Sequence, residues 1–125
     1  MIEVVLTNEG YVSLFNLDVD QTYMQNSILV EDGVDREHFI TNSIFYKIID
    51  NHLVFDKDKK AEADHQFRIS VIRMRRQAEC FSVVDRSQLW YNTLTNEQKA
   101  ELQEWYEAWL VAPDTLVIPT KPDWL

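Results

Sequence analysis

The residue types that most often carry chemistry are scarce in this chain of 125 residues, which has three histidines and one cysteine. Glu62 and His65 have the Glu-x-x-His spacing that places both side chains on one face of a helix. Di-iron bundles use this pair twice and add further glutamates, whereas here it occurs once. We therefore interpret Glu62 and His65 as part of a solvent-facing helix surface, and we expect no metal site.

Other candidates for metal binding or nucleophilic catalysis are equally isolated. Asp35, Glu37 and His38 do not fit the spacing of a calcium loop, so we interpret them as surface residues. Cys80 lies among apolar residues of an expected helix, where a buried small side chain is a better interpretation than a catalytic thiol. Two glycines in total leave no room for a phosphate-binding loop or a Gly-x-Ser-x-Gly motif. We expect a protein that is not an enzyme and needs no cofactor.

The charge is divided into blocks along the chain. Lys and Arg number 12 against 21 Asp and Glu, and a net charge of −9 disfavours nucleic-acid binding, which requires a basic surface. Residues 57–76 hold seven basic and three acidic side chains, whereas both flanking blocks are acidic. Within the basic block, Arg73, Arg75 and Arg76 are the best anion-binding candidate. We favour the alternative that they neutralise the protein's own acids or cap helix carbonyls.

The apolar runs are too short for a membrane span, which needs roughly 20 residues. The N-terminal residues have neither the basic region nor the cleavage site of a secretion signal. A single cysteine excludes an internal disulfide and fits a reducing compartment. We expect no membrane partner.

The acidic first block has the composition of β structure, because β-branched and aromatic residues dominate its apolar runs. Gly10 can adopt the positive φ of a turn. Asp50 and Asn51 tolerate the left-handed conformation that a type I′ hairpin requires. We therefore predict one hairpin from residues 2–6 and 11–15, a second from 44–49 and 52–55, and a turn at Asp32-Gly33.

From about residue 58 the apolar period becomes helical, with steps of four and three residues that define one face. We predict a helix over residues 58–81. Its apolar face either docks on the domain's own sheet or mediates self-association into a homo-oligomer. Both stay open, because a coiled-coil assignment needs at least three heptads. The face consists of Phe67, Val71, Met74, Ala78 and Phe81.

A second helix is predicted from its boundary residues. Thr95 and Gln98 form a capping box at its start, and Pro113 ends it soon afterwards. A connection of about 14 residues predicts an antiparallel helical pair. The fold class is therefore α+β, with a β-rich N-terminal domain over residues 1–56 and a helical arm over residues 57–125. This arm ends in an extended tail rich in proline and tryptophan.

All four tryptophans lie within the last 36 residues. Tryptophan anchors cores and also dominates binding hot spots. An extended segment with prolines loses little entropy when it docks on a partner. The alternative is that Trp124 folds back on Trp105 and Trp109 as an internal clasp. The residues expected to contact a partner are Trp105, Trp109, Pro119, Pro122 and Trp124.

The order of motifs in the C-terminal half resembles the tail assembly chaperones of tailed bacteriophages, which are related to tail fibre assembly proteins. The hairpin Tyr46–Phe55, followed directly by a charged helix, is similar to their middle region. The segments that carry the resemblance are Asp85-x-x-Gln88-Leu89, Leu94-Thr95-x-Glu97-Gln98-Lys99-Ala100, the aromatic-x-x-Ala segment Trp105–Ala108, Pro113, and Pro119-x-Lys121-Pro122-x-Trp124.

The resemblance implies a non-enzymatic phage or prophage protein that binds an unassembled tail or tail fibre polypeptide. Its place would be the cytoplasm of the host bacterium, or the virion at the tail or fibre tip. The alternative is a structural virion protein or oligomeric scaffold that self-associates through residues 67–81.

Overall fold

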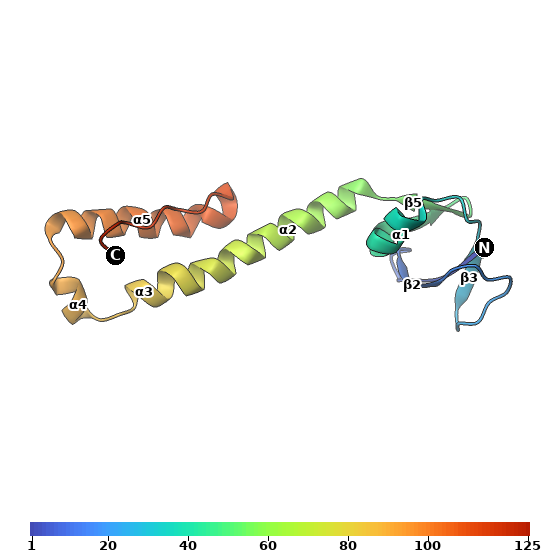
Figure 1. The fold of residues 1–125 in the computed structure, drawn as a ribbon, viewed down its shortest axis with the longest axis horizontal. Coiled ribbons are helices and arrows are strands. Elements are labelled where there is room, and N and C mark those ends of the chain that lie inside the picture. Colours follow the sequence, from blue (N-terminus) through green and yellow to red (C-terminus); the bar gives the residue numbers. More distant parts are fainter. The chain divides into compact units, whose positions relative to one another are not determined.

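In the computed structural model, which describes all 125 residues, the chain divides into two compact units, Met1–Glu62 and Ala63–Leu125. The fold is α+β, as predicted, because the strands lie in the first unit and the long helices follow them (Figure 1). The division falls inside helix α2 (Lys57–Arg76), a few residues after the boundary expected at residue 56.

The first unit contains a three-stranded antiparallel sheet. Its strands are β1 (Ile2–Leu6), β2 (Val12–Asn16) and β3 (Ser27–Val30), in the order β2-β1-β3. The hairpin of β1 and β2 is confirmed, and its Gly10 has a φ of 88°. Ile2 and Val4 of the central strand β1 face the core, whereas Glu3 points to the opposite face and is fully buried where the loop between β2 and β3 donates hydrogen bonds to it.

The second hairpin pairs β4 (Tyr46–Ile49) with β5 (His52–Phe55). Asp50 and Asn51 have φ values of 51° and 63°, which confirms the left-handed turn predicted for this pair. Residues 44 and 45, expected to begin the strand, instead belong to a 3-10 turn, Ser43–Phe45.

The structure also contains a helix that the sequence pattern did not predict, α1 (Arg36–Asn42). The carboxylate of Asp35 caps its first turn by accepting a hydrogen bond of 3.2 Å from the His38 amide. The imidazole Nδ1 of His38 lies 2.6 Å from the hydroxyl of Tyr46. Asp35 and His38 are therefore engaged in local structure, and α1 contributes Phe39 to the core. That core is formed by Ile2, Val4, Val12, Val30, Phe39, Tyr46 and Leu53.

One continuous helical segment leads into the second unit. Helix α2 is followed by a π-helical turn (Gln77–Phe81) and by α3 (Ser82–Val84). The helix predicted over residues 58–81 is thus confirmed and runs three residues further. A short helix, α4 (Gln88–Asn92), lies in the connection.

The second long helix is α5 (Asn96–Thr115), and it begins with the predicted capping box of Thr95 and Gln98. Pro113 lies in its last turn, and the helix ends two residues later at Thr115, followed by Leu116, which adopts the left-handed conformation with a φ of 58°. Within the second unit α5 runs back along the end of α2 and α3, as an antiparallel pair (Figure 1). None of the helices has the length and apolar composition that a membrane span requires.

Candidate partner-binding site

Two of the tryptophans expected to contact a partner form the core of the second unit instead. Trp105 and Trp109 are 5% and 1% exposed, so the expectation that they face a partner is wrong for this conformation. The physical reason is their spacing with Leu102, because residues three and four apart on α5 share one face, which packs against the end of α2. The buried cluster is Ile72, Cys80, Leu102, Trp105, Trp109 and Ala112.

The C-terminal tail returns along α5, which is the internal clasp left open by the sequence. Trp124 is partly buried against the tryptophan cluster. Its indole Nε1 donates a hydrogen bond of 2.9 Å to a carboxylate oxygen of Glu101. Pro119 and Pro122 line a cavity together with Trp105. The five predicted partner residues are therefore brought together, but by packing on one another within the second unit.

The apolar face predicted for α2 remains largely exposed. Phe67 and Met74 are 69% and 67% exposed, so within the second unit neither α5 nor the C-terminal tail covers them. Ala78 is also exposed, whereas Val71 is half-buried. Phe81 turns inward to pack against the tryptophan cluster, because the π-helical turn inserts an extra residue and rotates the end of the helix.

An open groove of about 250 Å³ lies beside this exposed face, between α2 and the chain that follows α5. Its apolar walls come from Phe67, Val71 and Ile72 on one side and from Leu116 and Ile118 on the other. The left-handed Leu116 turns the chain at the end of α5, and this turn brings Ile118 to the groove. Helical periodicity predicted Phe67 and Val71 here, but no local sequence signal indicated that the tail would supply the second wall.

Two arginines also line this groove, Arg68 and Arg75. Arg75 donates to Glu79 at 2.6 Å and 3.2 Å, and its guanidinium lowers the pKa of the Glu79 carboxyl. Arg68 is exposed and has no ion-pair partner in the structure. Arg68 was not among the predicted site residues, although it is adjacent to Phe67 in the basic block.

The other two arginines of the predicted anion-binding run, Arg73 and Arg76, have different surroundings from each other. Arg76 donates from Nη1 to the backbone carbonyl of Leu110 at 3.3 Å, and its guanidinium lies over the ring of Phe81. Arg75 is paired with Glu79, as described above. Two of the three side chains are thus used within the chain, which agrees with the favoured interpretation. Arg73 is exposed.

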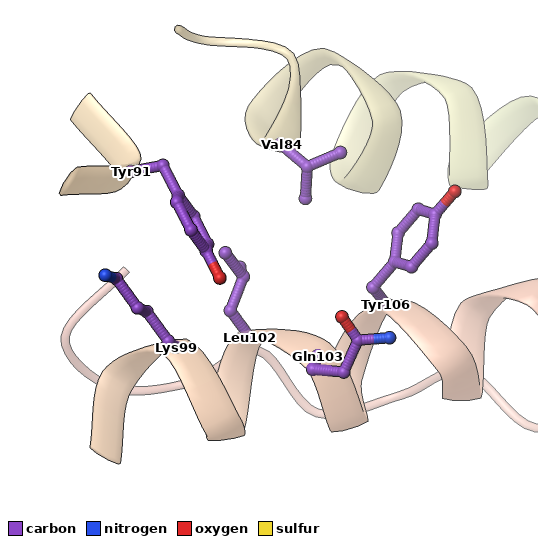
Figure 2. Close-up of a pocket in the computed structure, with 6 residues that line it drawn as sticks. All are labelled: Val84, Tyr91, Lys99, Leu102, Gln103 and Tyr106. Carbon is purple, nitrogen blue, oxygen red and sulfur yellow. The ribbon is translucent and has the colours of Figure 1, made fainter. Parts of the chain in front are cut away.

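A second shallow pocket of about 220 Å³ lies among α3, α4 and α5 (Figure 2). Val84 points into it from above, opposite Leu102 on α5, while Tyr91 and Lys99 lie at one end (Figure 2). The ammonium of Lys99 lies 4.9 Å from the centroid of the Tyr91 ring. No histidine, cysteine or acidic side chain lines this pocket.

The residues that could carry covalent or metal chemistry are not assembled into a site. Cys80 is fully buried, and burial raises the pKa of its thiol to about 11, so its nucleophilic thiolate is disfavoured. His65 lies on an exposed part of α2. No group of three or more His, Cys, Asp or Glu side chains is arranged to hold a metal ion.

The geometry thus contains one feature suited to a macromolecular partner, namely the exposed face of α2 and the groove beside it. Comparisons with protein-family models, with curated proteins and with solved structures found no match to this chain.

Proposed function

We propose that this chain is a non-enzymatic assembly chaperone for a phage or prophage tail or tail fibre polypeptide. The observation that carries the proposal is the uncovered apolar face of α2, where Phe67 and Met74 are more than two-thirds exposed. Large apolar side chains left in water next to an apolar groove are typical of surfaces that bind another protein. The sequence resemblance of the C-terminal half supplies the identity of the client.

The proposed mechanism is transient coverage of apolar surface. An unassembled tail or fibre polypeptide exposes apolar segments that would otherwise aggregate. The face of α2 covers such a segment, and assembly of the client removes it from the chaperone. The compact second unit provides a rigid platform, because its tryptophan core fixes α2 against α5.

The resemblance also supports a location in the cytoplasm of the bacterial host, where tails and fibres are assembled. A permanent place on the virion, at the tail or fibre tip, is the variant of this proposal in which the chaperone stays with its client.

Co-expression with the neighbouring tail genes tests the function directly. The soluble fraction of the fibre polypeptide is measured with the full chain, without it, and with a chain that lacks residues 113–125. We expect the soluble fraction to fall without the chain. We expect the truncated chain to be defective, because the truncation removes the Leu116 and Ile118 wall of the groove and the Trp124 clasp. Fibre folding that is indifferent to the whole protein refutes the proposal.

A second candidate function is a structural or scaffold protein that self-associates through α2. The observation that favours it is the seven-residue interval between Phe67 and Met74, which places both exposed side chains on one helical stripe. Size-exclusion chromatography with light scattering tests this candidate. A stable oligomer that dissociates when Phe67 and Met74 are both changed to Ala supports it, and a monomer rejects it.

A further inference from the structure

The groove beside α2 has the size and lining of a pocket for one large apolar side chain. Ile72 is buried at its base, and Phe67 stands exposed at its rim. Leu116 and Ile118 close the opposite side. A volume of about 250 Å³ accommodates a leucine or phenylalanine side chain together with part of its backbone. Transfer of such a side chain from water into this groove is favourable, because both surfaces are apolar.

The charge around the groove selects what can accompany that apolar side chain. Arg68 lines the groove without an ion-pair partner, whereas the charge of Arg75 is shared with Glu79. The stretch of α2 inside the second unit, residues 63–76, contains four arginines and one acidic residue. A partner with carboxylates near its apolar anchor would therefore gain a charge-assisted hydrogen bond at Arg68, and a basic partner would be repelled.

We propose that this groove is the docking site for a client segment in which one large apolar side chain is flanked by acidic residues. This inference rests on the proposed chaperone function and names the surface and the chemistry of the client. The apolar anchor enters between Phe67 and Ile118, and a neighbouring carboxylate pairs with Arg68. The tryptophans and the prolines of the tail do not line this groove, so they are not expected to contact the client.

A binding titration with defined peptides tests the chemistry. The probe is a short fluorescein-labelled peptide with a central phenylalanine between glutamates, and the matched probes carry glutamine or lysine in place of glutamate. Fluorescence anisotropy with the full chain reports affinity. We expect the glutamine peptide to bind about threefold to tenfold more weakly and the lysine peptide to show no saturable binding. Added salt should weaken only the glutamate peptide. Equal binding of all three peptides overturns the proposal.

Two pairs of matched variants test the location. Phe67→Ala and Arg68→Ala change residues that line the groove, whereas Leu89→Ala and Arg73→Ala change an exposed apolar residue and an exposed arginine of the second unit that lie outside it. We expect about a tenfold loss for Phe67→Ala, because it removes an apolar wall, and about threefold for Arg68→Ala. Leu89→Ala and Arg73→Ala should bind as the unchanged chain does. All four side chains are exposed, so each variant should keep its thermal stability.

The outcomes separate this inference from the function on which it rests. If Leu89→Ala weakens binding of the peptide as much as Phe67→Ala does, or if light scattering shows a dimer that Phe67→Ala dissociates, the groove proposal is wrong. If the client remains soluble with Phe67→Ala and Arg68→Ala but not without the protein, the chaperone function stands and the groove fails. If the peptide and variant affinities differ as expected but the client folds equally well without the protein, the groove proposal stands and the chaperone function fails.

Discussion

The buried carboxylate of Glu3 accepts a hydrogen bond of 2.5 Å from the hydroxyl of Ser27. The same carboxylate also accepts bonds from the backbone amides of Tyr23 and Met24, at 2.6 Å and 2.7 Å, and from the Asn16 side chain. A charge in the centre of a small sheet is costly to bury unless it is fully hydrogen-bonded. Glu3 meets this condition by fastening the loop between β2 and β3 to the central strand β1.

This arrangement predicts that the first unit loses stability in acid. Burial alone would raise the pKa of Glu3, but the bonds from Met24, Ser27, Asn16 and Tyr23 outweigh it and lower the pKa from 4.5 to about 2. A lowered carboxyl pKa stabilises the fold above the unfolded pKa and loses that contribution as the pH falls towards the folded one. Urea unfolding midpoints measured from about pH 6 down to about pH 2.5 should fall below about pH 4.5.

Glu3→Gln isolates this contribution from the other carboxylates. Glutamine keeps the shape, but it removes the charge and brings an NH2 group towards donors that require an acceptor. We expect the variant to be less stable at neutral pH, with a difference from the unchanged protein that narrows as the pH drops towards 2. A difference that is constant with pH would show that the charge of Glu3 does not contribute.

The turn between β4 and β5 predicts a stabilising substitution. Asn51 has a φ of 63°, a conformation that glycine adopts without the steric cost of a Cβ atom. Asp-Gly is a preferred type I′ pair, so Asn51→Gly should raise the free energy of unfolding by up to about 1 kcal/mol. Asn51→Ala is the control, and it should lower stability because alanine is strained at positive φ. Chemical denaturation followed by circular dichroism measures both variants.

Local signals in the sequence were sufficient for the hairpin turns and for the start of α5. Asp50-Asn51 and the Thr95–Gln98 pair each specify their own backbone geometry through side chains a few residues apart. The burial of Glu3 could not be predicted in this way, because alternation along a strand places a charged residue towards solvent. Its partners lie 13 to 24 residues away, at the ends of the neighbouring strands and in the loop that joins them.

The buried face of α2 was also beyond local prediction. Two apolar stripes run along this helix, one with Phe67 and Met74 and one with Ile69 and Ile72. Only the packing of α5 decides between them, and it buries Ile72 of the second stripe. The π-helical turn after Arg76 then moves Phe81 from the first stripe into the core. The sequence left two alternatives for Trp124, a clasp within the chain or contact with a partner. It could not decide between them, because a proline-rich tail loses little entropy whether it docks on its own chain or on a partner. In the structure Trp124 forms a hydrogen bond with Glu101.

The environment of Cys80 predicts an inert thiol. The residue is fully buried, and desolvation raises its pKa to about 11, with only a small opposing effect from Arg76. Reaction with a thiol-specific disulfide reagent at neutral pH should therefore be slower in the native protein than in urea by on the order of a hundredfold or more. Because the chain has one cysteine, the signal has a single source. Rapid labelling of the native protein would contradict the buried position.

The contrast between Trp109 and Phe67 provides the most direct test of which aromatic side chains form the core and which face a partner. Trp109 is 1% exposed, so Trp109→Ala should leave a large cavity and lower the free energy of unfolding by about 3–5 kcal/mol. Phe67 is 69% exposed, so Phe67→Ala should change stability by less than about 0.5 kcal/mol. Urea unfolding of the two variants, followed by circular dichroism, measures both values. Similar losses would show that Phe67 is buried in solution, either by the chain itself or by a second copy. A negligible loss for Trp109→Ala would mean that the tryptophan cluster does not hold α2 and α5 together, and the groove between α2 and Ile118 would then lack its support.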